Sequence, residues 1–482
     1  MTASSRATPV TALLFAVALA SWSVTLVLAW PTYFDMNPAS GAVATLAQAV
    51  REGRVPGGRE GETFLATFYF PPFPILVSGL HRLGLEWKDA LRTASVLGGL
   101  ALLIAVGFGA RALGRGWRGS VLAVALLLST YFFQSSTLGG RADLLAAGLS
   151  IGSLALWMRD QELEGWGAPA LAAGAFLTKA TSVSVPLAVL MWAIAGRRPG
   201  RLVRFAVRFT AAALVWVALT FPAGGPTWYV SAIRELVTAT PCTWSLARGP
   251  AEIVRYVANF SELAVIAALA LAMLARPAMR ATPLAPYGIA SGALALFVMT
   301  NYGAGHNHLD ELTAYGAMLG GTWVAGRIGR GGPLPMLVLV VGVLSASWRD
   351  LVPVIRHTPN PANRRPEVLA AVRDEPGRVF TEDGLLALAA GRTPAIADPG
   401  ALRSLVLKGD PRAVRVVRDL DEARYDLVVL MTDLDSGAYW YRNFHLGEPI
   451  VDAIRRRYRA AGTADGFHFY RPNPPRALRP QS

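Results

Sequence analysis

The chain has 482 residues, of which 53% are hydrophobic and only 16% are charged. A soluble protein of this length would carry about a quarter charged residues, so the composition excludes an ordinary soluble protein and indicates a polytopic membrane protein. The net charge of +14 does not indicate nucleic-acid binding, because much of the basic excess lies in short connections between apolar segments. Cys242 is the only cysteine, which excludes an intrachain disulfide.

Eleven apolar segments follow one another along the chain, bounded by charged or Pro/Gly-rich connections. They lie near 9–29, 93–110, 119–137, 143–158, 167–178, 181–195, 205–222, 257–275, 284–300, 312–326 and 333–347. Since a helix of about 20 residues crosses a bilayer, the sequence predicts about eleven transmembrane helices. The first is interpreted as an uncleaved span, because the apolar stretch continues beyond the cleavage-like Ala18-Leu19-Ala20. If the two short segments 167–178 and 181–195 were one kinked span, all later segments would change sides.

Positive charge favours two separate short helices and a cytoplasmic N-terminus. With that topology the inner connections carry fourteen arginines, including Arg197, Arg198, Arg201, Arg204 and Arg208. The outer connections after the first loop carry only Arg141, Lys179, Arg234, Arg248 and Arg255. Because inner loops of membrane proteins are enriched in Lys and Arg, this asymmetry orients the chain. The unusual polar residues then fall on the outer side.

The first outer loop, residues 31–92, opens with Asp35 directly after the first span. Asn37-Pro38 predicts a helix start, with Asn as N-cap and Pro at the first helical position. Val43, Leu46, Ala47 and Val50 follow as an apolar stripe suited to a membrane surface. Residues 68–85 predict a second interfacial helix. Asp35 is either a solvated loop carboxylate or a base that meets a lipid-carried substrate at the membrane surface.

Two further outer turns carry charged residues at membrane depth. Arg141 and Asp143 flank the start of a span, either as a helix-capping pair or as an arginine that holds a phosphate while Asp143 orients it. Lys179 lies in the turn between the two short helices. Ionisable groups at this depth are costly and are usually functional, and an ammonium group suits a phosphate or diphosphate.

The segment "NYGAGHNHLDEL" (301–312) concentrates His306, Asn307, His308 and Glu311 in a Gly-rich turn. These side chains favour a pocket for a polar substrate, with a helix cap as the plain alternative. His306, His308 and Glu311 could also be read as ligands of a divalent metal, although His-x-His with one carboxylate is a weak metal signal. We therefore assign no metal ligand.

The tail from residue 349 changes composition and predicts a small α/β domain outside the membrane. "RVFTED", "TPAIAD", "YDLVVLMTD" and "FHFYRP" are typical of short strands, and "LLALAAG" and "PIVDAIRRRY" of helices. Alternation of strands and helices favours a mixed α/β fold. The "MTDLD" segment (431–435) resembles an acid-x-acid metal motif, but strand ends are commonly acidic and nucleotide sugars are generally absent outside the membrane.

Taken together, Asp35 after the first span, "YFPPFP", "GRADLLAAGLS", "FLTKATSVSVPLAVLMW" and "GAGHNHLDEL" resemble the GT-C membrane glycosyltransferases. The likeness is to bacterial relatives of the protein O-mannosyltransferases and the lipid A sugar transferases, and it covers residues 9–348. It divides the chain into a GT-C-like catalytic domain (1–348) and an extracytoplasmic α/β domain (349–482).

The resemblance implies a glycosyltransferase that moves a sugar from a polyprenyl-phosphate carrier to a glycan, lipid or protein acceptor by an inverting displacement. It implies that Asp35 is the general base, and that Arg141, Lys179 and the 306–311 segment lie near the carrier phosphate or the sugar. Many members have two acids in the first loop, whereas this chain has Asp35-Met36. The implied location is the plasma (inner) membrane, with the site and the tail on its periplasmic or extracellular side. The alternative is a transporter or flippase of a lipid-linked glycan or anionic solute.

Overall fold

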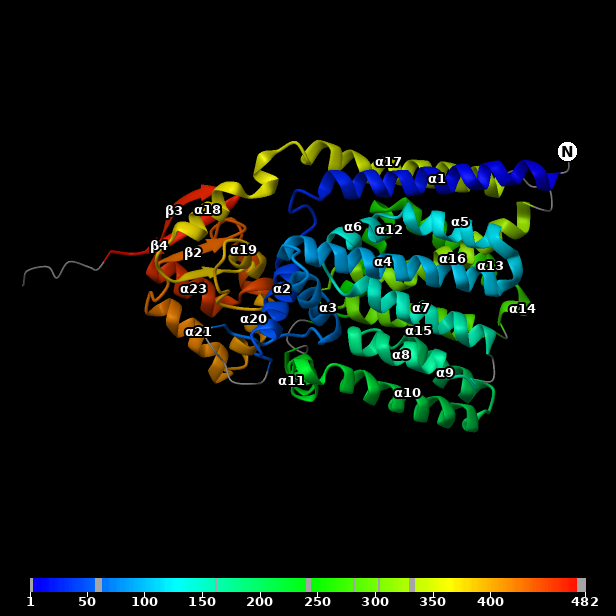
Figure 1. Ribbon diagram of the computed structural model, residues 1–482, viewed down its shortest axis with the longest axis horizontal. Helices are drawn as coiled ribbons and strands as arrows, with labels where there is room; N and C mark the ends of the chain where they lie inside the picture. Colours follow the sequence, from blue (N-terminus) through cyan, green and yellow to red (C-terminus); the bar gives the residue numbers. More distant parts are fainter. Residues whose placement is uncertain are drawn as a thin grey trace, which may run out of the picture.

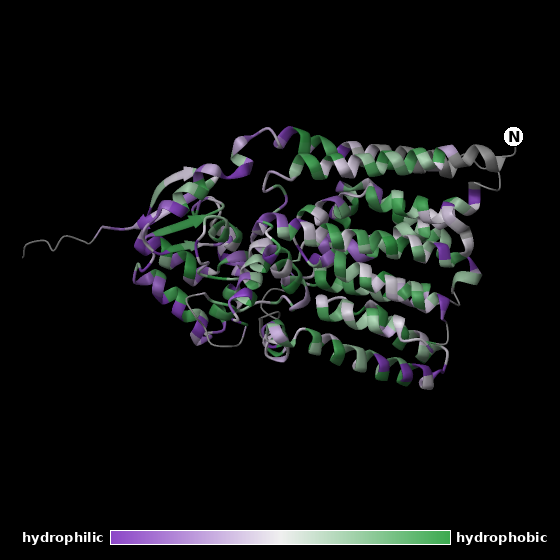
Figure 2. Cartoon of the chain, in the orientation of Figure 1, coloured by the Kyte–Doolittle hydropathy of each residue, from purple (hydrophilic) through white to green (hydrophobic). Residues whose placement is uncertain are grey.

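A computed structural model describes residues 3–56, 63–160, 163–239, 244–280, 282–301, 304–328 and 334–474. Cys242 and part of the Gly-rich loop before Glu62 lie outside these ranges. Long helices run side by side through most of the molecule, and a compact α/β domain lies against one end of them, opposite the N-terminus (Figure 1). The helical region is predominantly hydrophobic and the C-terminal domain is richer in hydrophilic residues (Figure 2).

The predicted apolar segments all fall on helices. These helices are α1 (Ala3–Ala29), α4 (Trp87–Ala110), α5 (Gly116–Leu128), α6 (Tyr131–Leu138), α7 (Asp143–Arg159), α8 (Gly167–Thr178), α9 (Ser184–Ala195), α10 (Pro199–Leu219), α13 (Ser261–Leu274), α15 (Leu284–Met299), α16 (Asp310–Ile328) and α17 (Leu334–His357). Shorter helical elements connect them: η1 (Arg111–Arg115), η2 (Phe221–Ala223), α11 (Gly225–Ala239), α12 (Arg248–Asn259), α14 (Pro277–Arg280) and η4 (His306–Leu309).

Several of these helices are apolar enough to cross a membrane. Among the described residues, three helices are individually long and apolar enough, and the number rises to five if each of two bent pairs counts as one span. One pair is α5 and α6, which meet at 66°, and the other is α12 and α13, which meet at 105°. The predicted segment 119–137 is therefore broken rather than continuous. The chain is a multi-pass membrane protein, while eleven crossings stay a prediction.

Small residues let the central helices α4 and α7 approach closely. A Cβ atom added at Gly98 would lie 2.8 Å from the backbone nitrogen of Leu145, and one added at Gly148 would lie 2.9 Å from that of Leu102. Helix pairs in membranes gain most of their stability from such close van der Waals packing, because lipid tails are as apolar as leucine. This packing fixes the start of α7, where Asp143 lies.

The predicted first outer loop folds into two helices, α2 (Pro38–Arg51) and α3 (Pro72–Arg82). The predicted start of α2 is confirmed: the Asn37 side chain accepts from the backbone N–H of Ala39, and Pro38 occupies the first turn. The predicted role of its apolar stripe is wrong. Val43 and Leu46 are fully buried against protein, because α2 packs against α3 and the C-terminal helix α19 (Gly384–Ala389).

The tail forms a four-stranded mixed sheet in the order β1-β2-β4-β3. β1 (Val379–Thr381) and β2 (Leu427–Leu430) are parallel, with Val379 opposite Leu427, and β4 (Phe467–Pro472) pairs antiparallel with β2 and with β3 (Tyr458–Ala464). The surrounding helical elements are η5 (Pro361–Arg364), α18 (Pro366–Asp374), α19, α20 (Pro399–Leu407), α21 (Pro411–Asp421), α22 (Ala438–Trp440), η6 (Tyr441–His445) and α23 (Glu448–Arg457). The predicted α/β character of the tail is confirmed.

Three details of the tail differ from the sequence prediction. Residues 393–398, predicted as a strand, form only an isolated parallel bridge between Ile396 and Phe64 of the first outer loop. β3 was not predicted, because its residues "YRAAGTA" are mostly exposed and lack apolar alternation. α17 also continues to His357, beyond the predicted end of the last span.

Candidate active site

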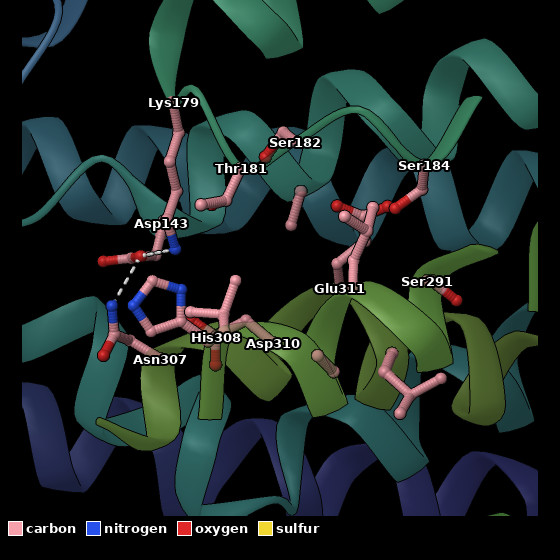
Figure 3. Close-up of a pocket in the computed structure, with 15 residues that line it drawn as sticks. Asp143, Lys179, Thr181, Ser182, Ser184, Ser291, Asn307, His308, Asp310 and Glu311 are labelled. Atoms are coloured by element: carbon pink, nitrogen blue, oxygen red, sulfur yellow. Dashed lines mark hydrogen bonds and ion pairs between the residues drawn. The ribbon is translucent and has the colours of Figure 1, made fainter. Parts of the chain in front are cut away.

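Three segments that are distant in the sequence meet at the end of the helical bundle that faces the C-terminal domain. They are the start of α7, the turn between α8 and α9, and η4 with the start of α16. Side chains from all three point toward one another in Figure 3. They meet because α8 ends, and α7 and α16 begin, at the same end of the bundle (Figure 1). The structure therefore brings these predicted residues together at one end of the bundle.

Asp143 lies at the centre of this site. Its Oδ1 atom accepts a hydrogen bond from Nδ2 of Asn307 at 2.8 Å and forms an ion pair with the ammonium of Lys179. Nε of Arg141 lies 4.0 Å from Oδ2 of Asp143. The N-cap residue of α7, Ala142, makes no side-chain capping bond, and Asp143 lies in the first turn, where the helix dipole favours an acid. The carboxylate also holds two positively charged side chains and an amide around one point.

A cavity of about 30 Å³ opens beside Asp143. Its polar lining residues are Asp143, Lys179, Thr181, Ser182, Ser184, Ser291, Asn307, His308, Asp310 and Glu311 (Figure 3). Pockets that hold small ligands typically measure about 300–1,000 Å³. The cavity in this conformation is smaller than a typical ligand pocket.

Asp35 lies in the turn between α1 and α2, with a left-handed backbone (φ 60°). Its carboxylate accepts a hydrogen bond from Ser135 and lies within electrostatic reach of Arg141 and Arg92. Burial raises the pKa of Asp35 to about 6, while Arg141, the Ser135 bond and Arg92 act in the opposite direction. Such a carboxylate is mainly ionised at neutral pH and has a pKa close enough to 7 to accept a proton effectively.

A short polar path connects Asp35 with the histidine turn. The Ser135 hydroxyl that contacts Asp35 also lies 3.2 Å from Nε2 of His306. Arg141 interacts electrostatically with both Asp35 and Asp143. Asp35 and Arg141 do not line the cavity itself. The eight predicted site residues therefore form one continuous polar region, in which Arg141 connects the acid of the first loop with the cavity.

Both histidines of η4 are held in the neutral form. Burial, together with the positive charge of Arg141, lowers the pKa of His306 to about 4 despite the opposing effect of Asp143. Burial and then Lys179 lower the pKa of His308 to about 3. The His306 ring also stacks on Phe132 with its centroid 5.5 Å away and an angle of 9°. Neutral imidazoles here can form hydrogen bonds to a substrate but add no positive charge.

The metal interpretation of His306, His308 and Glu311 receives no support from the geometry. In the described segments, no three His, Cys, Asp or Glu side chains lie together as a metal site requires. Glu311 instead accepts hydrogen bonds from the hydroxyls of Tyr287 at 2.7 Å and Ser150 at 2.9 Å. Its carboxylate thus ties α16 to α15 and α7 at the edge of the cavity.

Three functional candidates were not predicted. Asp310, next to the predicted Glu311, lines the cavity and accepts a hydrogen bond from Ser136 at 2.8 Å. Its other oxygen, Oδ1, is buried with no hydrogen-bond partner among the described residues, so it can accept one from a ligand. Ser135 and Arg92 contact the Asp35 turn. Arg92 could have been found from the sequence. In the "WKDALR" segment, Lys88 and Arg92 lie one helical turn apart at the start of α4.

Solved structures of two membrane proteins share this architecture. ArnT from Cupriavidus metallidurans, solved with bound undecaprenyl phosphate, matches with a TM-score of 0.63 and 13% identity, covering 95% of this chain and 97% of that chain. Its apo form gives 0.61 and 15%, covering 96% and 98%. The oligosaccharyltransferase AglB from Archaeoglobus fulgidus, in complex with an inhibitory peptide and a dolichol-phosphate, gives 0.53 and 13%, covering 95% and 74%.

These likenesses establish the fold over nearly the whole chain. No protein-family model and no curated protein sequence matches this chain, and at 13–15% identity the structural likeness extends to architecture alone. The chain therefore has the GT-C fold, which confirms the predicted fold class, including a small mixed sheet after the helical region.

Proposed function

We propose that this protein is a glycosyltransferase that transfers a sugar from a polyprenyl-phosphate carrier to an acceptor hydroxyl on the outer face of the membrane. The observation that carries the proposal is that Arg141 interacts with both the Asp35 carboxylate and the Asp143–Lys179 pair. The proposed base and the two proposed phosphate-binding cations therefore lie in one polar region, and the fold is shared with proteins solved with bound polyprenyl phosphates. Displacement at a glycosyl phosphate needs a base for the acceptor hydroxyl and cations for the departing phosphate.

The proposed reaction is a single inverting displacement. The acceptor oxygen attacks the anomeric carbon and gives up its proton to Asp35, while the bond between that carbon and the phosphate oxygen breaks. The bonding electron pair leaves with the phosphate of the carrier. A well-positioned base contributes about 10²–10⁴-fold to such a step. The pKa of Asp35, about 6, suits this role at neutral pH.

Arg141 and Lys179 are assigned to the departing phosphate. Charge that develops on the leaving oxygen is stabilised most effectively by fixed cations in a site with little water. Asp143 holds the Lys179 ammonium in place, and Asn307 donates to the same oxygen of Asp143. Asp310, with its unpartnered Oδ1, is assigned to a sugar hydroxyl. The neutral His306 and His308 are assigned as further hydrogen-bonding groups around the sugar.

The proposed location is the plasma (inner) membrane, with the site and the C-terminal domain on the periplasmic or extracellular side. The support is the arginine-rich start of α10, with Arg201, Arg204 and Arg208, at the opposite end of the bundle from the site (Figure 2). The proposed partners are a polyprenyl-phosphate-linked sugar, the surrounding lipid, and a glycan, lipid or protein acceptor.

The proposal is tested with the purified full-length protein in lipid nanodiscs. Undecaprenyl phosphates carrying different radiolabelled sugars are offered together with membrane lipids or envelope proteins as acceptors. Acceptor-dependent release of undecaprenyl phosphate is expected with at least one donor, and Asp35→Asn should abolish it. Asp435→Asn, a change at an exposed tail carboxylate, should retain it. Movement of the carrier across vesicles without sugar transfer would identify the protein as a flippase and refute the proposal.

A further inference from the structure

The turn that carries Asp35 is held by one buried arginine of helix α4. Nη1 of Arg92 donates to the carbonyl oxygens of Ala29 at 2.5 Å and Trp30 at 2.7 Å, and Nη2 donates to that of Phe34 at 2.9 Å. The Arg92 side chain is fully buried. Since these carbonyls belong to the end of α1 and to the turn itself, Arg92 fixes the backbone on both sides of Pro31 and directly before Asp35.

The same turn is also held by residues that begin the C-terminal domain. The backbone N–H of Tyr33 donates to the carbonyl oxygen of Asn363 at 2.8 Å. The Arg365 guanidinium lies 4.5 Å from the centre of the Tyr33 ring and forms an ion pair with Oδ2 of Asp383 at 2.7 Å. A cation over an aromatic face, desolvated as here, is attracted by the ring quadrupole. We name Tyr33, Arg365 and Asp383 the clasp.

The acidic member of the clasp is itself fixed against α2. Oδ1 of Asp383 caps α19 by accepting from the backbone N–H of Leu385 at 3.0 Å. Helix α19 lies beside α2 (Figure 1), and a Cβ atom at Gly41 of α2 would collide with Asp383 and lie 2.7 Å from the nitrogen of Gly384. The C-terminal domain therefore approaches the helix that follows Asp35 as closely as two backbones can.

Two non-glycine residues at this junction have left-handed backbones. They are Asp35 with φ 60° and Arg365 with φ 56°. A residue with a side chain adopts this conformation only where its surroundings enforce it, at a cost of about 1–3 kcal/mol. The clasp connects the two, because Tyr33, two residues before Asp35, is the residue that Arg365 covers. The contacts of the clasp thus lie between the two strained residues, Asp35 and Arg365.

From this arrangement we infer that Arg365 is a positioning residue for Asp35: through the clasp, the C-terminal domain sets the backbone of the turn that presents the carboxylate. The inference rests on the proposed function, in which Asp35 is the base. In this inference the C-terminal domain contributes to the geometry of the active site and is more than an appended module. A displacement of a reacting group by about 1 Å can reduce a rate by about 10², so loss of the clasp should lower kcat rather than donor binding.

The structural arm of the test is hydrogen–deuterium exchange on the full-length protein in nanodiscs. Arg365→Gln removes the cation, and Tyr33→Leu removes the ring from the turn while leaving the tail intact. The amides of residues 33–36 should exchange about tenfold faster or more in both variants, in proportion to the lost protection. Peptides covering β1 and β2 should be unchanged. Arg378→Gln is the matched control, because Arg378 also covers a tyrosine, Tyr425 at 4.7 Å, and pairs with Asp419.

The kinetic arm uses the donor and acceptor that the wild-type protein accepts. Arg365→Gln and Tyr33→Leu should lower kcat by about tenfold or more with KM for the donor unchanged, and Arg365→Lys should recover part of the loss. Unchanged exchange at residues 33–36, or unchanged kcat despite faster exchange, would overturn the inference. Equal loosening of the turn and of β1 in Arg365→Gln, without an effect of Tyr33→Leu, would also overturn it. If the wild type transfers no sugar, the proposed function fails, while the exchange arm still reports on the clasp.

Discussion

The ammonium of Lys179 lies against Oδ1 of Asp143, thirty-six residues earlier in the chain. Their side chains are only 19% and 6% exposed. Two opposite charges taken out of water lose hydration, and the pair is stable only while both partners are present. Because Asn307 donates to the same oxygen, this ion pair connects the start of α7, the turn after α8 and η4. The pair is therefore both part of the proposed phosphate site and a structural link.

Removal of the lysine should destabilise the whole protein. Lys179→Met leaves a buried carboxylate without its closest cation, and we expect the free energy of unfolding to fall by about 3 kcal/mol. Denaturation curves in one detergent provide the measurement. The double variant Lys179→Met/Asp143→Asn should recover more than half of the loss. Lys408→Met, at an exposed lysine of the tail, is the control and should stay within about 0.5 kcal/mol of wild type. Equal free energies of unfolding for Lys179→Met and Lys408→Met would contradict the buried pair.

The rate of transfer should fall as the pH is lowered through about 6. Asp35 must be ionised to accept a proton, and burial raises its pKa to about 6. We expect log kcat/KM to rise with a slope of one up to that pH and to level off above it. His306 and His308 have pKa values of about 4 and 3, so they do not titrate in this range. A profile that stays flat down to pH 4.5 would exclude Asp35 as the base.

Two neighbouring serines allow the acid limb, the part of the pH–rate profile below about pH 6, to be assigned to one carboxylate. The hydrogen bond from Ser135 lowers the pKa of Asp35, so Ser135→Ala should move the limb to higher pH. Ser136 donates to Asp310 instead, and Ser136→Ala should leave the limb in place. A shift of the limb in Ser136→Ala alone would mean that Asp310, rather than Asp35, controls the profile.

Arg141 should act in both halves of the site. Arg141→Gln removes a cation from the leaving phosphate, and we expect kcat/KM to fall by about 10²-fold. The same change removes a positive charge that lowers the pKa of Asp35, so the acid limb of the residual activity should move upward. Arg248→Gln, at an arginine outside the site, serves as the control in the same assay. A loss of rate without any movement of the acid limb would show that Arg141 does not influence the pKa of Asp35.

Docking of the tail onto α2 should depend on the absence of a side chain at Gly41. Gly41→Ala would place a methyl group against Asp383 and the backbone of Gly384, so we expect lower thermal stability and faster proteolysis between α17 and α18. Gly79→Ala on α3, where a Cβ meets no atom within 4 Å, is the control and should be neutral or slightly stabilising. Equal proteolysis rates in both variants would show that the domains do not approach this closely in solution.

Much of the helical architecture could be predicted from local sequence patterns. Each apolar segment falls on a helix, and Asn37-Pro38 marks the start of α2, because hydrophobic length and capping are local properties. The bend between α5 and α6 was not predicted, since the apolar segment around Ser129 and Thr130 continues across the break. Burial of α2 was missed because its partner, α19, lies more than 300 residues away in the sequence.

The composition of the site could be predicted, but not its contacts. A one-sided distribution of polar residues places Lys179 and the histidine turn together, and the structure brings both to Asp143. Asp310 was missed although it lines the cavity together with Glu311, because adjacent helical residues differ by about 100° in direction and the sequence does not give the rotation of α16. The clasp depends on contacts between Tyr33 and Arg365, which no local pattern indicates.

The bridge between Phe64 and Ile396 has a consequence for how the protein is made. Phe64 exchanges backbone hydrogen bonds with residues 395 and 397, each 2.9 Å long, and these partners leave the ribosome about 330 residues later. At a synthesis rate of about 5–20 residues per second, residues 395 and 397 are synthesised roughly 15 to 70 seconds after Phe64. The loop that carries Asp35 therefore reaches its final form only near the end of translation, and a nascent chain stalled within the membrane region holds the acid without the contacts that shape it.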